Sequence, residues 1–98
     1  MHARMTRLKA DSEQMNEAVQ SYRDALSQFA DIDGNRGAFL LVDQSNGIGV
    51  GITLWETEDS MAAARERANE IRQQAVEQVS AKIEAVEEYA VAVWEPRG

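Results

Sequence analysis

The sequence predicts an α+β fold in which the elements follow the order β-α-β-β-α-β. Two segments repeat apolar residues every three or four positions, as amphipathic helices do. Four shorter segments alternate in the manner of strands, and an Asn-Gly pair, a strong hairpin signal, separates the middle two. We expect the 98 residues to form a single domain, residues 1–98.

The first strand is expected from His2 to Lys9 and the first helix from Asp11 to Ile32. Asp33-Gly34 is expected to end this helix. The helix is predicted by one apolar stripe, which consists of Met15, Ala18, Val19, Tyr22, Ala25, Leu26 and Phe29. The candidate N-terminal caps are Asp11 and Ser12, with Gln14 in capping-box position relative to Asp11.

The second and third strands are expected from Gly37 to Asp43 and from Ile48 to Glu56, joined as a hairpin by Gln44-Ser45-Asn46-Gly47. The second helix should begin at Thr57, whose hydroxyl can cap it. Its stripe is rich in alanine, so we expect this helix to pack unusually close to its neighbour. The stripe consists of Met61, Ala64, Ala68, Ile71, Ala75 and Val79, and the fourth strand is expected at about Glu88 to Glu95.

This order is the ferredoxin-like, or split βαβ, arrangement, a four-stranded antiparallel sheet with two helices on one face. The other face must be polar or covered by something else. Four aliphatic side chains left in water would forgo roughly 6–12 kcal/mol, which rivals the stability of a small domain. We therefore predict a homodimer that joins sheet to sheet. Apolar residues lie on both faces of two strands: Ala38, Leu40 and Val42 against Phe39 and Leu41, and Tyr89, Val91 and Val93 against Ala90, Ala92 and Trp94.

The third strand lacks side chains at two alternate positions on one face only. Gly49, Gly51, Thr53 and Trp55 share that face, opposite Ile48, Val50, Ile52 and Leu54. Glycine inside a strand often marks the close approach of another backbone or a ligand. Close packing of the second helix, a cavity beside Trp55, and a local twist or bulge each explain the pattern. The alanine-rich second helix favours placing the glycines beneath it.

Composition excludes several classes of protein. There is no cysteine, and the lone histidine, His2, offers no partner for a metal site, so we expect neither metal nor cofactor. The net charge of −7 opposes nucleic-acid binding, and the sequence lacks the aromatic motifs of an RNA-recognition domain. No apolar run is long enough to span a membrane or act as a signal peptide, so a cytoplasmic protein is expected.

The chain resembles the antibiotic-biosynthesis-monooxygenase-like proteins of the dimeric α/β-barrel superfamily. The resemblance covers essentially the whole chain and rests on "GAFLLVD", on "GIGVGITLWETEDSMAAA" and on the closing "EEYAVAVWEP". It implies a homodimer in which two sheets face each other as a barrel, with a small cavity between sheet and helices in each subunit. It also implies either a cofactor-independent monooxygenase or a binder of a small aromatic molecule.

The family's enzymes use an Asn on an early strand, a Trp, and a Tyr or His near the second helix. Only Trp55 has a counterpart here, which disfavours haem degradation and leaves the catalytic residues unassigned. Arg7 is a further ligand candidate because its neighbours in phase are apolar, although snorkelling at a sheet edge or a salt bridge across a dimer interface is the favoured explanation. The alternative function is a non-enzymatic homodimeric interaction module. The candidate ligand-binding residues are Trp55, Gly49, Gly51, Thr53 and Arg7.

Overall fold

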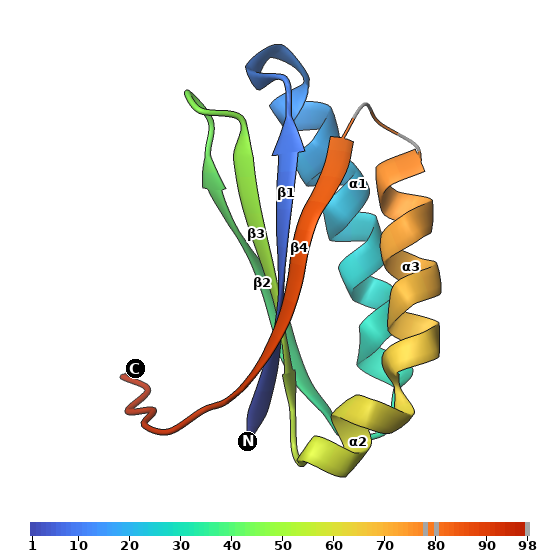
Figure 1. The fold of residues 1–98 in the computed structure, drawn as a ribbon, viewed down its shortest axis with the longest axis vertical. Coiled ribbons are helices and arrows are strands. Elements are labelled where there is room, and N and C mark those ends of the chain that lie inside the picture. Colours follow the sequence, from blue (N-terminus) through green and yellow to red (C-terminus); the bar gives the residue numbers. More distant parts are fainter. Residues whose placement is uncertain (78, 80, 98) are drawn as a thin grey trace.

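The computed structural model describes residues 1–77, 79 and 81–97 and contains four strands and three helices over these residues (Figure 1). A short 3₁₀ turn lies on each side of the first helix. The elements are β1 His2–Ala10, η1 Ser12–Gln14, α1 Met15–Ser27, η2 Gln28–Asp31, β2 Asn35–Asp43, β3 Ile48–Trp55, α2 Glu58–Ala63, α3 Arg65–Glu77 and β4 Ala81–Ala90.

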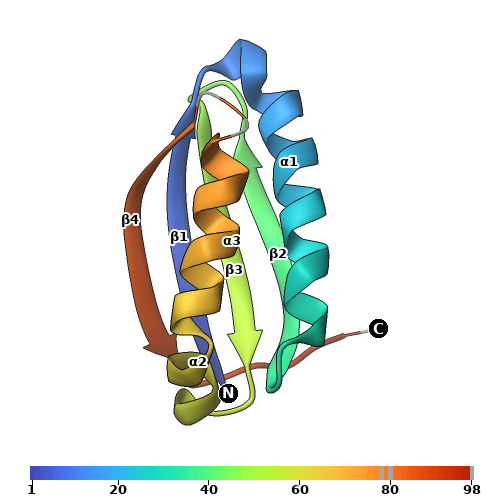
Figure 2. The ribbon, with the colours of Figure 1, turned by 90° about the vertical axis from the view of Figure 1, so that its right-hand side faces the viewer.

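The sheet has the order β2-β3-β1-β4, and all of its neighbouring strands are antiparallel. Helices α1 and α3 lie side by side on one face, and α2 connects β3 to α3 (Figures 1 and 2). The predicted ferredoxin-like fold is therefore confirmed. In the part of the chain that the structure describes, no helix has the length and apolarity needed to cross a membrane.

The hairpin between β2 and β3 turns at Gly47, as the Asn-Gly pair predicts. Gly47 has φ +67°, a backbone conformation that favours glycine. A Cβ at this position would lie 2.1 Å from the carbonyl oxygen of Ala10, whose amide donates to the Gly47 carbonyl at 2.8 Å. The hairpin is thus fixed against the end of β1, and a side chain at Gly47 would prevent that contact.

The helix boundaries follow the predictions only in part. Thr57 caps α2 as expected, in a reciprocal capping box with Ser60. The capping prediction for the first helix was wrong, because the Asp11 side chain makes no cap hydrogen bond. Instead, a 3₁₀ turn precedes α1, and the Gln14 amide closes this turn by donating to the Asp11 carbonyl. The second helix is also not continuous, since it is interrupted at Ala64.

The predicted position of the fourth strand was wrong. The strand covers Ala81–Ala90 instead of residues 88–95, because β1 pairs with it along its whole length, from His2 opposite Ala90 to Ala10 opposite Ala81. Beyond it, the amide of Val91 donates to the Met1 carbonyl at 2.9 Å, and residues 91–97 run away from the sheet on the side opposite the helices (Figure 1).

A β-bulge explains why the predicted position of this strand was wrong. The register of β4 shifts between Arg7 and Leu8 of β1, so that Ala85 lies opposite Arg7 while Ile83 lies opposite Leu8. The extra residue is Glu84, whose carboxylate accepts from Arg7 Nε at 3.3 Å. The strand therefore changes phase in the middle, and its apolar residues do not alternate as an unbroken strand requires.

The core lies between the sheet and the helices. Its side chains come from all layers and consist of Ala25, Phe29, Trp55, Met61, Ala64, Ala68, Ile71 and Ala75. The opposite face of the sheet remains partly apolar, because Phe39 and Leu41 are 42% and 53% exposed there. Val50 and Ile52, their partners on β3, are half-buried.

Candidate functional site

The glycine face of β3 lies against the helices, but a different helix from the one predicted makes the close contact. Gly51 lies beneath Tyr22 of α1, and a Cβ at Gly51 would stand 1.8 Å from the Tyr22 hydroxyl oxygen. Tyr22 is itself buried. At Gly49 a Cβ would meet nothing nearer than Leu40 Cδ1 at 3.5 Å, an ordinary contact. The missing side chain at Gly51 therefore makes room for a tyrosine of α1 and not for the alanine face of the second helix.

Trp55 is completely buried at the end of the same face. Its indole Nε1 donates to Thr53 Oγ1 at 2.9 Å, which satisfies the one polar atom of the ring. Phe29 meets the ring edge-on, with centroids 6.3 Å apart and planes at 73°. The guanidinium carbon of Arg4 lies 5.9 Å from the indole centroid, within range of a cation–π contact.

Arg7 lies on the opposite face of the sheet from the other four candidate residues. Its side chain is 46% exposed and pairs with Glu84 at 3.3 Å. Because neighbouring residues of a strand point to opposite faces, Arg7 cannot share a site with Trp55 inside one subunit. The structure thus brings Thr53 and Trp55 into direct contact on the helix side and leaves Arg7 on the outer side.

Arg4 is a functional candidate that the sequence analysis set aside in favour of Arg7. It is 2% exposed, and its Nε and Nη2 both lie 2.9 Å from Glu88 Oε2. Nη2 also donates to the carbonyl of Met61 at 2.9 Å, near the end of α2. Among the described residues, Nη1 has no hydrogen-bond acceptor. The sequence signal that could have identified Arg4 is the phase of the first strand. Arg4 lies on the same face of this strand as Thr6 and Leu8, and both of these residues are buried.

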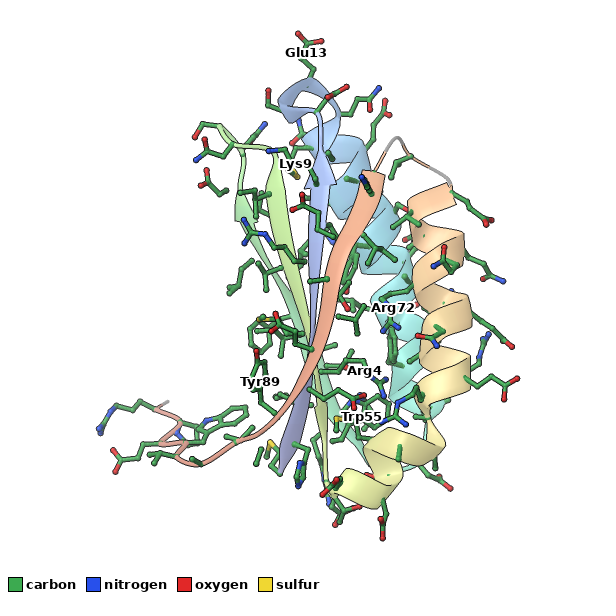
Figure 3. All side chains as sticks on the ribbon, viewed as in Figure 1. Arg4, Lys9, Glu13, Trp55, Arg72 and Tyr89 are labelled. Carbon is green, nitrogen blue, oxygen red and sulfur yellow. The ribbon has the colours of Figure 1, made fainter. Side chains whose placement is uncertain are left out.

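A cavity of about 320 Å³ opens beside Arg4, between α3 and strands β1 and β4. Figure 3 shows the side chains of Arg4 and Arg72 in this space, with Trp55 next to Arg4. Three arginines and one glutamate give the lining a net charge of +2, in a chain whose overall charge is −7. The lining residues are Arg4, Arg65, Asn69, Arg72, Val86 and Glu88.

The ionisable groups around this cavity are perturbed in a consistent way. Burial, and then the charge of Arg4, lower the pKa of Arg72. Hydrogen bonds, from Arg65 first and also from Arg4, lower the pKa of Glu88. Burial raises the pKa of Tyr22, and the charge of Arg72 opposes that effect. The cavity therefore keeps positive charge in a partly desolvated setting, where it can stabilise an anion.

A second hollow of about 250 Å³ lies between α1 and β2, on the same side of the sheet. It is mostly apolar and has a single charged residue, Arg23; the other lining residues are Val19, Leu26, Leu40 and Val42. No group of three or more His, Cys, Asp or Glu side chains placed to hold a metal ion occurs among residues 1–77, 79 and 81–97. The arginine cavity is thus the more highly charged of these two hollows and offers the stronger contacts to a charged ligand.

Comparison with known proteins gives matches of two kinds, and the first is in sequence. The family model "Antibiotic biosynthesis monooxygenase" matches residues 1–78. Rv2557, an uncharacterised protein of Mycobacterium tuberculosis, is 33% identical over 93 residues, which are 94% of this chain and 41% of that protein. The chain therefore spans about two-fifths of the length of the curated relatives it matches.

The second kind of match is in structure. A proposed antibiotic biosynthesis monooxygenase from Deinococcus radiodurans superimposes with a TM-score of 0.74 at 16% identity, covering 100% of both chains. SnoaB, a cofactor-independent oxygenase from Streptomyces nogalater, gives a TM-score of 0.71 at 14% identity over 98% of this chain and 97% of its own. At these identities the two structures establish a shared fold.

Proposed function

This chain belongs to the antibiotic biosynthesis monooxygenase family, and from that premise we propose that it binds a small aromatic molecule in the arginine cavity and oxygenates it without a cofactor. The observation that carries the proposal is the cavity of about 320 Å³ between α3 and the sheet, with the buried Arg4 in its lining and Trp55 beside Arg4. Its volume is at the small end of the roughly 300–1,000 Å³ typical of ligand sites, which suits one or two rings.

The reaction that fits this lining is the oxygenation of a phenol that ionises easily. One atom of O₂ enters the substrate as a carbonyl oxygen and the other leaves as water. The substrate supplies all the electrons by losing its hydroxyl hydrogen and the hydrogen of the ring carbon that is oxygenated. Negative charge builds up first on the phenolate and then on a peroxide intermediate. Arg4 and Arg72 supply fixed positive charge for both, as preorganised electrostatic catalysis requires.

Among the described residues that line this cavity, Glu88 is the one carboxylate, and its contacts make it a weak base. Arg4 and Arg65 both bind it, and their hydrogen bonds lower its pKa. The proposed reaction therefore depends on lowering the pKa of the substrate hydroxyl by nearby guanidinium groups, with the proton passing to solvent, and not on a strong base in the protein. Trp55 acts through Arg4, whose guanidinium lies over its ring, and Thr53 holds that ring by accepting a hydrogen bond from the indole Nε1.

The test is oxygen uptake with a two-ring phenol such as 1-naphthol, in buffer treated with a metal chelator, together with ligand-induced melting shifts. The variant Val86→Trp should fill the arginine cavity and abolish both signals. Val42→Trp is its matched control, because Val42 lines the hollow between α1 and β2 instead. Loss of both signals in Val42→Trp alone would move the site to that hollow. An inactive wild type with no melting shift would contradict the proposal.

We also propose that the chain forms a homodimer through the outer face of its sheet. Phe39 and Leu41 are exposed there beside Val50 and Ile52, and the segment after β4 adds Val93, 83% exposed, and Trp94, 48% exposed. Burying such side chains contributes roughly 1.5–3 kcal/mol each, and a two-fold axis buries the same surface twice. The same face supports the alternative function, a homodimeric interaction module that takes no small ligand.

A further inference from the structure

The buried positive charge in the arginine cavity is only partly balanced. Glu88 is shared between Arg4 and Arg65, with distances of 2.9 Å and 2.7 Å. Arg72 is 7% exposed, and the hydrogen-bond partner that the structure gives its guanidinium is the neutral side chain of Asn69. The described lining of the cavity therefore has three guanidinium groups and one carboxylate, and two of the arginines, Arg4 and Arg72, are buried.

A purely structural role explains part of Arg4 but not the whole arrangement. Nε and Nη2 are used by Glu88 and by the Met61 carbonyl, and the guanidinium lies over Trp55. These contacts fix the side chain without using Nη1, which is buried and has no acceptor among the described residues. A buried donor without a partner costs free energy, and a second buried guanidinium nearby adds like-charge repulsion. Burial lowers the pKa of Arg72, and the charge of Arg4 lowers it further.

An acceptor with negative charge, placed between the two arginines, would pair with both guanidinium groups. We infer that the ligand of this cavity carries a carboxylate, which Arg4 Nη1 and the Arg72 guanidinium bind together. This inference rests on the proposed ligand site and adds the chemical class of its occupant, an aromatic carboxylate. Arginine is well suited to the task, because its planar fork matches a carboxylate and keeps its charge when buried.

A carboxylate fits better than a phosphate because of Glu88. This carboxylate pairs with Arg4 and Arg65, and of those two only Arg4 is buried. Buried Arg4 and Arg72 together with Glu88 therefore carry a net charge of +1, which a monoanion balances, whereas a dianion would leave excess negative charge beside Glu88. The apolar wall at Val86 favours a ring attached to the charged group.

The experiment is calorimetric titration of the full chain with 2-naphthoate, with its neutral isostere 2-naphthamide, and with inorganic phosphate. We expect naphthoate to bind at least 10-fold more tightly than either of the others. The variant Arg72→Gln should weaken naphthoate binding roughly 10- to 150-fold, the range for losing one charge-assisted hydrogen bond. Arg67→Gln is the matched control, since it removes the same charge from an exposed position of the same helix, and it should change the affinity less than twofold.

Each outcome decides a separate question. Equal binding of naphthoate and naphthamide, unaffected by Arg72→Gln, would overturn the carboxylate inference and leave the proposed aromatic site intact. Failure of both probes to bind would overturn the two proposals together, and tighter binding of phosphate alone would replace the carboxylate by a phosphate. If circular dichroism shows that Arg72→Gln does not fold, the salt dependence of binding to the wild type tests the carboxylate inference instead. The affinity for naphthoate must then fall as the salt concentration rises, whereas the affinity for naphthamide must not.

Discussion

Gly51→Ala tests the packing that holds β3 against α1. The added Cβ would stand 1.8 Å from the hydroxyl oxygen of Tyr22, 2.4 Å from its Cζ and 2.9 Å from its Cε1. Tyr22 is 5% exposed, so the ring cannot swing into solvent to make room. The backbone at Gly51 needs no positive φ, and the expected effect is therefore steric and not conformational.

The magnitude follows from two opposing effects. Overpacking a buried site costs roughly 1–3 kcal/mol. Replacing glycine inside a strand recovers roughly 0.5–1 kcal/mol because alanine loses less entropy on folding. We expect a net loss of about 1–2 kcal/mol, which for a domain of this size lowers Tm by roughly 4–16 °C.

The assay is thermal and urea unfolding followed by circular dichroism, with Gly49→Ala as the matched control. At Gly49 the nearest atom to an added Cβ is Leu40 Cδ1 at 3.5 Å, so Gly49→Ala should leave Tm unchanged or raise it slightly. In a Tyr22→Leu background, Gly51→Ala should cost much less, which gives a measurable coupling between the two sites. Equal Tm values for the two alanine variants, or an unchanged cost with Tyr22→Leu, would refute the reasoning.

Three further predictions concern the dimer, the cavity and the helix cap. Light scattering at micromolar concentration should give about twice 10.9 kDa for the wild type and about 10.9 kDa for Leu41→Lys. Val42→Lys, on the other face of β2, should stay dimeric, and a monomeric wild type would contradict the sheet-to-sheet dimer. Glu88→Gln should lower the free energy of unfolding at pH 7, because the folded state lowers the pKa of Glu88 and is stabilised only while this carboxylate is charged. The difference from wild type should therefore shrink as the pH falls below the ordinary Glu pKa of 4.5 and through the lowered pKa of the folded state. A constant difference from pH 7 to pH 3 would contradict this. Thr57→Ala removes the hydroxyl that accepts from the Ser60 amide at 3.0 Å and should cost roughly 0.5–2 kcal/mol in urea unfolding, whereas no loss would show that the cap is dispensable.

The fold was predictable because it depends on local signals that the sequence states directly. The turn at Asn46-Gly47 and the cap at Thr57 were both placed correctly. Alternation in β3 separated the glycine face from Val50 and Ile52 without telling which face meets the helices. The alanine-rich second helix favoured the glycine face, and the structure places it there. What alternation cannot tell is which helix residue meets which glycine, because that depends on helix placement in three dimensions. The partner of Gly51 proved to be Tyr22, from a helix that sequence reasoning had not considered for it.

The candidate site was harder to predict, because an arginine can be buried only where its partners are also assembled. Strand phase puts Arg4 and Arg7 on opposite faces, and the apolar neighbours of Arg7 drew attention to the wrong one. The partners that make the burial of Arg4 tolerable are Glu88 and the carbonyl of Met61, which lie 84 and 57 residues away along the chain. Nothing within a local window of sequence shows them.

The bulge in β4 connects the error in the fold to the error in the site. If β4 had no bulge, a continuous register that keeps Glu88 opposite Arg4 would put Glu84 opposite Leu8, on the buried face. The bulge lets Ile83 take that place and turns Glu84 toward Arg7 on the outer face. It therefore reconciles a buried apolar contact at one end of the strand with a buried ion pair at the other. The same phase change hides residues 81–87 from a search for alternation, so the strand was expected to begin only at Glu88 and its pairing with β1 was not found.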